Sequence, residues 1–255
     1  KDIESYQLRD LRHWYERFYA PNNAALVVVG DVNPEEVINY AQQYFGIYKS
    51  NPAIEKDKNQ PSLAKTKQSK VLKLKAELPF YVMSFHVPSL KTADKKDEAY
   101  QLEMLAYVLD NGLSKTLIRD QQIVSAISTG YRLYDKYNTL FTLSFVPAKG
   151  VDKRSVMQAV KSQVQELIEN PALIENELQR IKAQLEANFI FEQDQISTQS
   201  YYLGMLTTVG LGIDKMFKYV DKMNKIGAKS VSNVAKKYLN FKLANSVELI
   251  PQGLK

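Results

Sequence analysis

The chain has few residues that could hold a catalytic metal or act as a general base. Only two histidines occur among its 255 residues, His13 and His86, and there is no cysteine. His13 and Glu16 are three residues apart, a spacing that places an imidazole and a carboxylate on one helix face, where both could bind a metal. Neither His-x-x-Glu-His nor His-Glu-x-x-His occurs, so no zinc-peptidase motif is present. We interpret His13 as a surface or packing residue and His86 as a structural histidine within an apolar strand.

Other catalytic patterns are also missing from the sequence. There is no Gly-x-Ser-x-Gly motif for a serine nucleophile. Gly204, Gly210 and Gly212 are too scattered to form a phosphate-binding loop. The lack of cysteine excludes disulfides and thiolate metal sites, and it leaves the compartment open. We therefore predict no catalytic residue, no metal ligand and no cofactor in this chain.

Composition and charge fit a globular protein that has no membrane span. Hydrophobic residues make up 45% and charged residues 24% of the chain. No apolar run approaches the roughly 18 residues needed to cross a bilayer. The net charge is +6, and seven lysines fall in one polar stretch: Lys56, Lys58, Lys65, Lys67, Lys70, Lys73 and Lys75. No aromatic residue interleaves them to stack on bases, so we interpret the stretch as solvated and predict no nucleic-acid partner.

The pattern of apolar residues predicts alternating helices and strands. Helices are expected at 5–19, 34–45, 94–109, 113–121, 152–169, 172–209 with a bend near 197–200, 213–226 and 229–239. Strands are expected at 24–29, 71–76, 80–87, 124–134, 140–146 and 246–250. Because the order includes a hairpin and a long helical run, we predict an α+β fold. It would have one mixed, mainly antiparallel sheet of about six strands, with helices packed on one face.

The segment from Leu11 to Val32 is the most informative part of the chain. It predicts a helix, a Pro-Asn-Asn turn at 21–23, a valine-rich strand buried on both faces, and a new helix capped by Asn33. This order resembles the junction at which the second domain begins in the pitrilysin/insulinase family of zinc metallopeptidases, which includes the mitochondrial processing peptidases. The resemblance implies that residues 1–22 end a preceding domain or form a linker helix. Residues 23–255 would then be the C-terminal, non-zinc domain, with 47–69 as a surface loop or linker.

A second resemblance covers residues 111–126. In this family, a glycine-rich turn precedes a helix that ends in an arginine, and a tyrosine follows seven residues later. Both residues hold the substrate backbone near a zinc ion that is bound in another domain or subunit. Here Gly112 keeps the turn and Arg119 matches the arginine, but Ala126 stands at the tyrosine position. Arg119 is the one substrate-binding residue that the resemblance implies, and its structural alternative is an ion pair with Asp120 or Glu103.

Weaker matches at 176–185 and 202–204 extend the resemblance over most of the chain. It implies a domain that forms the substrate chamber and interface for proteolysis, with the zinc located elsewhere. The implied partners are a peptide or unfolded protein and a zinc-bearing sister domain or subunit, and a homodimer is a further alternative. Because bacterial members of the family are often exported, a periplasmic location is expected. The alternative function is a non-catalytic partner or scaffold subunit, and the absence of tyrosine at Ala126 is compatible with that reading.

Overall fold

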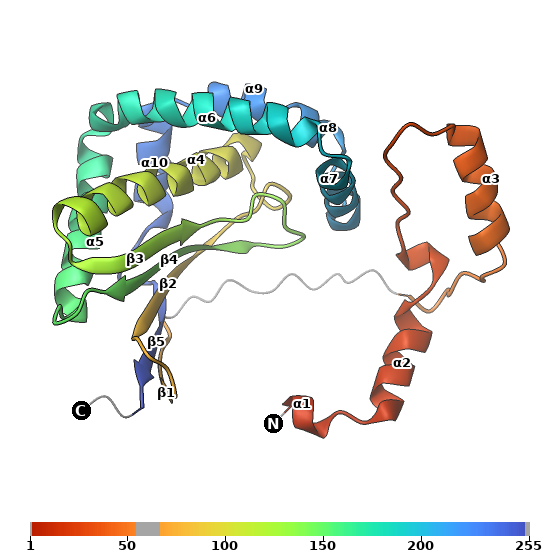
Figure 1. The fold of residues 1–255 in the computed structure, drawn as a ribbon, viewed down its shortest axis with the longest axis horizontal. Coiled ribbons are helices and arrows are strands. Elements are labelled where there is room, and N and C mark those ends of the chain that lie inside the picture. Colours follow the sequence, from red (N-terminus) through yellow and green to blue (C-terminus); the bar gives the residue numbers. More distant parts are fainter. Residues whose placement is uncertain (1, 55–66, 253–255) are drawn as a thin grey trace. The chain divides into compact units, whose positions relative to one another are not determined.

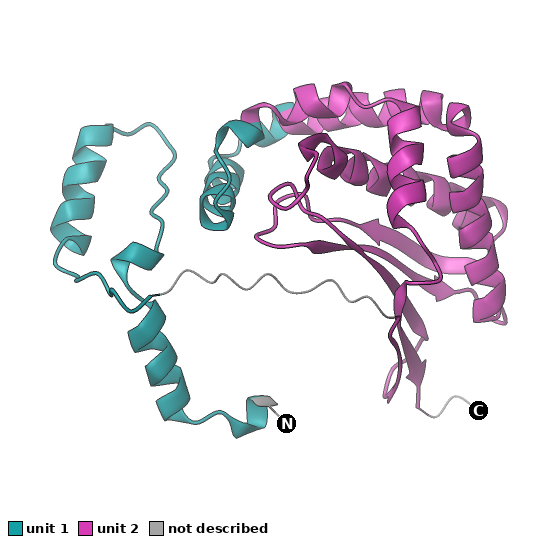
Figure 2. Ribbon diagram, turned by 180° about the vertical axis from the view of Figure 1, so that it is seen from behind, with its two compact units in different colours: residues 1–59, 190–216 teal, residues 60–189, 217–255 magenta. Residues whose placement is uncertain are grey.

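A computed structural model describes residues 2–54 and 67–252 of the chain (Figure 1). The chain divides into two compact units, which are coloured separately in Figure 2. Unit 1 comprises residues 1–59 and 190–216, and unit 2 comprises residues 60–189 and 217–255.

Unit 2 is built on a five-stranded mixed sheet with the strand order β1-β5-β2-β4-β3. The strands are β1 (Ser69–Leu74), β2 (Phe80–Val87), β3 (Val124–Gly130), β4 (Thr139–Pro147) and β5 (Asn245–Pro251). Only β1 and β5 pair in parallel, and the other neighbours are antiparallel. The predicted α+β class and mixed sheet are confirmed. The described residues contain five strands rather than about six.

Helices cover one face of this sheet (Figure 1). They are α4 (Lys96–Leu113), η2 (Ser114–Asp120), α5 (Lys153–Glu169), η3 (Pro171–Ile174), α6 (Glu175–Gln193), α9 (Tyr219–Asn224) and α10 (Ala228–Tyr238). Helices α4 and α10 pack against each other and contact strands β3 and β2, respectively. The last residues of α6 belong to unit 1.

The core of unit 2 lies between the sheet and these helices. Alternate residues of the two central strands point into it and are buried: Met83, Phe85, Val87, Phe141, Leu143 and Phe145. The period of two follows from the pleat of a strand, which sends successive side chains to opposite faces. The other face of the sheet carries half-buried and exposed side chains, and we call it the open face of the sheet.

Helix α4 continues through Asp110-Asn111-Gly112, the turn expected between the helices predicted at 94–109 and 113–121. The side chains of Asp and Asn often compete with a helix by bonding to nearby backbone groups. Here the Asp110 carboxylate accepts from the Thr129 backbone N–H of β3 at 2.8 Å, and the Asn111 side chain donates to the Tyr107 carbonyl at 2.9 Å. Both side chains are therefore satisfied without breaking the helix, and the predicted turn was wrong.

Unit 1 contains α1 (Asp2–Ser5), α2 (Leu8–Phe18), η1 (Pro21–Asn23), α3 (Pro34–Phe45), α7 (Ile196–Val209) and most of α8 (Asp214–Phe217). The break between α6 and α7 falls at 194–195, a few residues before the predicted bend. The segment predicted as a buried strand, 24–29, is not part of any sheet among the described residues. Within the described residues 3–54, no side chain is buried.

Candidate functional site

Arg119 lies near the end of a π-helix, η2, which follows α4 directly. The Gln121 N–H donates to the Thr116 carbonyl, five residues earlier, at 2.9 Å, which is the wider hydrogen-bonding pattern of a π-helix. Leu117 is buried and anchors this turn to the core. Such turns often occur at functional sites. No residue type in this segment signals a π-helix in advance, and the sequence predicts only a short ordinary helix here.

The Arg119 guanidinium is exposed, and it makes no hydrogen bond or ion pair with any residue that the structure describes. The alternative pairing with Asp120 or Glu103 is therefore not formed. An unpaired guanidinium retains all five of its N–H donors for an external carbonyl or carboxylate. The exposed position leaves Arg119 available to a ligand.

Two backbone irregularities separate Arg119 from Ala126. Gln122 has a positive φ of 53°, a conformation that a residue other than glycine seldom adopts. The Ile123 N–H then donates to the Leu117 carbonyl at 3.0 Å, which ties the connection back to η2. A β-bulge follows in β3, between Val124 and Ala126. Strained residues and bulges cluster next to functional sites, where they redirect side chains.

The bulge determines which way Ala126 faces. In a regular strand, Val124 and Ala126 would point to the same side of the sheet. With the extra residue, Val124 and Ile127 are both buried, whereas Ala126 and Ser128 are exposed on the open face. Alanine offers no hydroxyl to a ligand at this position. The nearest exposed hydroxyls are engaged within the sheet: Ser125 donates to the Val146 carbonyl at 3.3 Å, and Ser128 lies 2.9 Å from the Ser144 hydroxyl.

Tyr131 does not replace the missing tyrosine. Its hydroxyl donates to the Pro88 carbonyl at 2.7 Å. Burial is the main cause that raises the pKa of Tyr131, and the nearby Glu103 carboxyl adds to the effect. Tyr131 is therefore occupied in holding the β3–β4 connection to the end of β2.

Glu103 on α4, which the sequence offers only as a possible ion-pair partner of Arg119, is a half-buried residue whose carboxyl group points inward. Its Oε2 atom is buried and has no hydrogen-bond partner among the described residues. Burial raises the pKa of Glu103 to about 8, although a hydrogen bond with the Tyr219 side chain acts in the opposite direction. The same carboxyl contributes to raising the pKa of Tyr219, for which burial is again the largest cause. Glu103 therefore belongs to a buried cluster with tyrosines and is neutral in mildly acidic solution.

The two histidines lie in different units of the chain. His13 and Glu16 are exposed on α2 in unit 1, whereas His86 lies on β2 in unit 2. The Asn245 amide nitrogen is 3.1 Å from His86 Nε2, and the Asn245 Oδ1 accepts from the Gln68 N–H at 2.8 Å. This orientation of the amide makes His86 Nε2 the acceptor. Among the described residues, no group of three or more His, Cys, Asp or Glu is placed to hold a metal ion.

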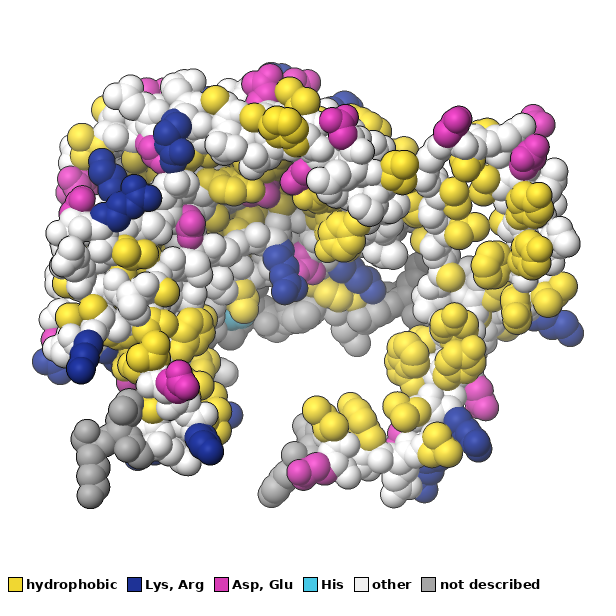
Figure 3. Space-filling model, in the orientation of Figure 1, with side chains coloured by type: hydrophobic (Ala, Val, Ile, Leu, Met, Phe, Trp, Pro, Cys, Tyr) yellow, Lys and Arg dark blue, Asp and Glu magenta, His cyan; other side chains and the backbone are white. Residues whose placement is uncertain are grey.

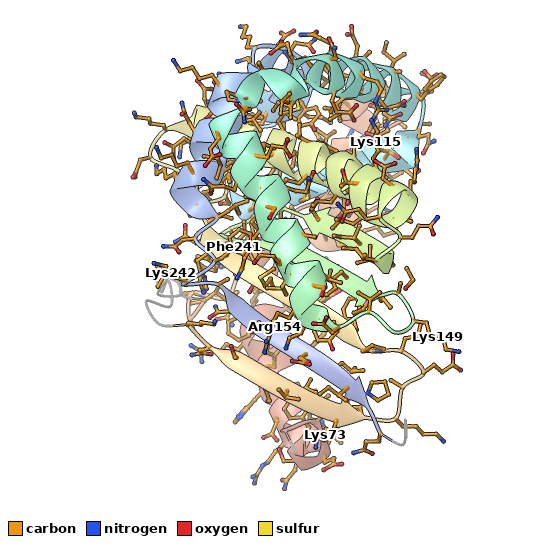
Figure 4. The ribbon with its side chains drawn as sticks, turned by 90° about the vertical axis from the view of Figure 1, so that its left-hand side faces the viewer. Lys73, Lys115, Lys149, Arg154, Phe241 and Lys242 are labelled. Carbon is orange, nitrogen blue, oxygen red and sulfur yellow. The ribbon has the colours of Figure 1, made fainter. Side chains whose placement is uncertain are left out.

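Basic side chains do not gather into one patch on the side of unit 2 seen in Figure 4. Lys73, Lys115, Lys149, Arg154 and Lys242 come from different elements and lie apart from one another (Figure 4). Three further lysines of the basic stretch, Lys56, Lys58 and Lys65, lie outside the described residues. The helices that the structure describes are all too short or too polar to cross a membrane.

The fold and this site define an α+β domain that presents an unpaired arginine beside an irregular turn and lacks a metal-binding cluster in its described part. The chain belongs to the peptidase M16 family, because residues 5–185 match the sequence profile of the peptidase M16 inactive domain. The family resemblance drawn from the sequence is thereby confirmed.

Known proteins support this assignment. The zinc protease PqqE of Helicobacter pylori is 26% identical over 199 residues, which are 74% of this chain and 43% of that protein. The crystal structure of a protease from Helicobacter pylori has a TM-score of 0.84 at 19% identity, covering 98% of this chain and 60% of that one. The first half of the periplasmic protease PqqL from Escherichia coli has a TM-score of 0.69 at 15% identity, covering 95% and 54%. The chain thus spans about half the length of these relatives.

Proposed function

We propose that this chain is the inactive domain of an M16-type zinc protease and forms part of the chamber in which a peptide is held for hydrolysis. The observation that carries the proposal is the exposed, unpaired Arg119 on its π-helical turn. An unpaired guanidinium can bind a peptide carbonyl or an acidic side chain through its planar fork of N–H donors.

The chain's own contribution is binding and orientation. Arg119 donates charge-assisted hydrogen bonds to the peptide backbone, and this contact positions the scissile bond. When bound in a sister domain or subunit, a zinc ion would provide an activated water and Lewis-acid polarisation of the carbonyl. Ala126 adds no hydroxyl donor, so Arg119 acts without the tyrosine that the family resemblance pairs with it.

The proposal includes a partner and a compartment. The partners are an unfolded or flexible peptide and a zinc-bearing peptidase domain, and a periplasmic location is supported by the description of PqqL as a periplasmic protease. The zinc would be bound outside this chain.

The test is peptide cleavage by this chain combined with its zinc-bearing sister domain. Replacing Arg119 with Gln is expected to lower kcat/KM about tenfold or more, because a hydrogen bond to a charged group contributes about 1.5–3 kcal/mol. Arg119→Lys should retain part of the activity, since it keeps the charge but loses the forked geometry. Lys115→Gln is the matched control, because Lys115 is exposed on the same turn. Equal kcat/KM for Arg119→Gln and the wild type would show that Arg119 does not bind substrate.

A second candidate function is a non-catalytic scaffold of the same fold. Ala126 favours it, because this position on the open face carries no group able to bind a substrate oxygen. In that case the assembled protein binds peptides without cutting them, and its sister domain lacks His-x-x-Glu-His. Zinc content and cleavage of an unstructured peptide, measured on the same sample, separate the two functions.

A further inference from the structure

Gln122 holds a backbone conformation that its residue type does not favour. Its φ is 53°, and in the described part of the chain it is the one residue other than glycine with a positive φ. This left-handed conformation costs free energy, because the Cβ atom crowds the neighbouring backbone. Glycine avoids the cost because it has no Cβ atom, and asparagine or aspartate can offset it with a local hydrogen bond. A glutamine at this position therefore needs a physical explanation.

Hydrogen bonds on both sides hold this left-handed turn in place. Before the turn, the Gln121 N–H donates to the Thr116 carbonyl at 2.9 Å. After it, the Ile123 N–H donates to the carbonyl of the buried Leu117 at 3.0 Å, and the Ile123 carbonyl accepts from the Ala148 N–H at 3.0 Å. A strained residue persists only where its surroundings fix it in this way. The turn is thus anchored to η2 and to the end of β4, all within unit 2.

The side chain of Gln122 does not stabilise the turn. It is exposed and makes no hydrogen bond with any residue that the structure describes. Glycine would adopt the same φ without strain, so the turn itself gives no reason for a glutamine. Backbone strain of this kind is typical of sites that bind ligands or catalyse reactions. A strained residue with a free polar side chain therefore points to a ligand.

The position of Gln122 places it in the candidate site. It lies between Arg119, whose guanidinium is unpaired, and Ala126, which has no hydroxyl. The hydrogen bond from Ile123 to Leu117 folds this connection back onto the turn that carries Arg119. A carboxamide has two N–H donors and one carbonyl acceptor, so it can bond both the C=O and the N–H of a peptide backbone.

The charges of unit 2 favour an uncharged group as the ligand of this carboxamide. Over unit 2, acidic and basic side chains are interspersed on the face seen in Figure 3, and they form no large patch of one sign. Interspersed charges give little long-range selection of a charged ligand. Recognition then depends on short-range hydrogen bonds, and a carboxamide matches the peptide group in both donor and acceptor.

We propose that Gln122 is a second substrate-binding residue, whose carboxamide hydrogen-bonds the peptide backbone next to the group that Arg119 holds. This inference rests on the proposed function because it concerns the same site, but it requires peptide binding and not hydrolysis. The contact supplies a hydrogen bond that Ala126 cannot make. Because it recognises backbone groups, it selects unfolded segments, whose N–H and C=O groups are not already used in a helix or a sheet.

The test combines peptide affinity with stability for the variant Gln122→Gly. Its Kd for a fluorescein-labelled unstructured peptide, measured in the complex with the sister domain, should rise about two- to tenfold, which corresponds to the loss of one neutral hydrogen bond. Its urea unfolding midpoint should equal or exceed that of the wild type, because glycine relieves the left-handed strain. A residue with a purely structural role would not combine weaker binding with undiminished stability.

Two further variants sharpen this test. Gln121→Ala is the matched control, since Gln121 is an exposed glutamine with an ordinary φ of −93°, and it should bind the peptide like the wild type. Gln122→Asn keeps the carboxamide on a residue that tolerates a left-handed conformation, and it should bind more tightly than Gln122→Gly. A wild-type Kd for Gln122→Gly would overturn the inference. Weaker binding with a lowered urea midpoint would also overturn it, because the side chain would then act through the fold.

The same assay separates this inference from the proposed function. If Arg119→Gln weakens peptide binding and cleavage while Gln122→Gly changes neither, the inference fails and the proposed function stands. If Gln122→Gly weakens binding to a complex that holds no zinc and cuts nothing, the inference stands and the proposed protease function fails.

Discussion

Replacing Glu103, whose carboxyl Oε2 is buried, with glutamine should change how the stability of unit 2 depends on pH. The folded pKa of Glu103 is about 8, against an ordinary value of 4.5. Because the folded pKa is raised, the contribution of Glu103 to the stability of the fold is fully present below pH 4.5. The free energy of unfolding then falls as the pH rises from 4.5 through 8. Each unit between the two pKa values corresponds to about 1.4 kcal/mol, so the loss at pH 7 is up to about 3 kcal/mol.

Glutamine has the shape of the protonated acid and does not ionise. Glu103→Gln should therefore be more stable than the wild type by up to about 3 kcal/mol at pH 7, with the two proteins converging near pH 4.5. The hydrogen bond with the Tyr219 side chain can be kept, because the amide carries both a donor and an acceptor.

The assay is urea denaturation of both proteins between pH 4.5 and 8.5, followed by far-ultraviolet circular dichroism. Other carboxylates contribute to each curve, so the difference between the two proteins isolates Glu103. Glu186→Gln is the control, since it removes the same charge from an exposed position on α6. A difference between wild type and Glu103→Gln that stays constant over this range would refute the reasoning, because Glu103 would then not titrate in it.

Two further substitutions test contacts that join distant parts of unit 2. Asp110→Ala leaves the Thr129 N–H without its acceptor and should lower the free energy of unfolding by about 1–3 kcal/mol, whereas Asp110→Asn keeps an oxygen there and should be near neutral in urea denaturation. Partial burial acts to raise the pKa of Glu98, but hydrogen bonds from Lys237 and Tyr238 outweigh it, so the net pKa is lowered. The stability from this site is full above pH 4.5 and is lost as the pH falls through the lowered value. Tyr238→Phe should raise the pKa of Glu98 in an NMR titration and cost about 1 kcal/mol at pH 7, and an unchanged pKa would contradict this account.

The sequence predicts most of unit 2 because its local patterns agree with its packing. The strand predicted at 80–87 has the bounds of β2, and its alternating apolar residues are those that enter the core. The helix predicted at 152–169 begins one residue late, because Asp152 acts as its cap by accepting from the Arg154 N–H at 2.8 Å. In both elements the spacing of the hydrophobic residues and the residues at the ends predict the same type of element with the same bounds.

The sequence predicts the candidate site less completely, because the geometry of the site depends on backbone features that cannot be predicted from residue types. The family resemblance selects Arg119 and Ala126. It does not predict the π-helical turn, the positive φ of Gln122 or the bulge before Ala126. Glutamine is not among the residues that favour a left-handed conformation, so no pattern search would have marked position 122. The burial of Glu103 is likewise set by tertiary contacts rather than by its place on α4.

The one strand predicted in unit 1 is where sequence and structure disagree, and the disagreement is informative. The run from Ala24 to Val29 predicts a strand buried on both faces, yet Leu26 and Val28 are exposed, and the backbone of residues 25–29 is unpaired in the described part of the chain. An apolar pattern predicts that a segment is covered in its stable state, and the covering surface can belong to another domain. The neighbouring helices α2 and α3 show the same mismatch, because their apolar faces are exposed as well. The segment and both flanking helices are therefore uncovered together in the described part of unit 1, which the apolar pattern of each element by itself does not predict.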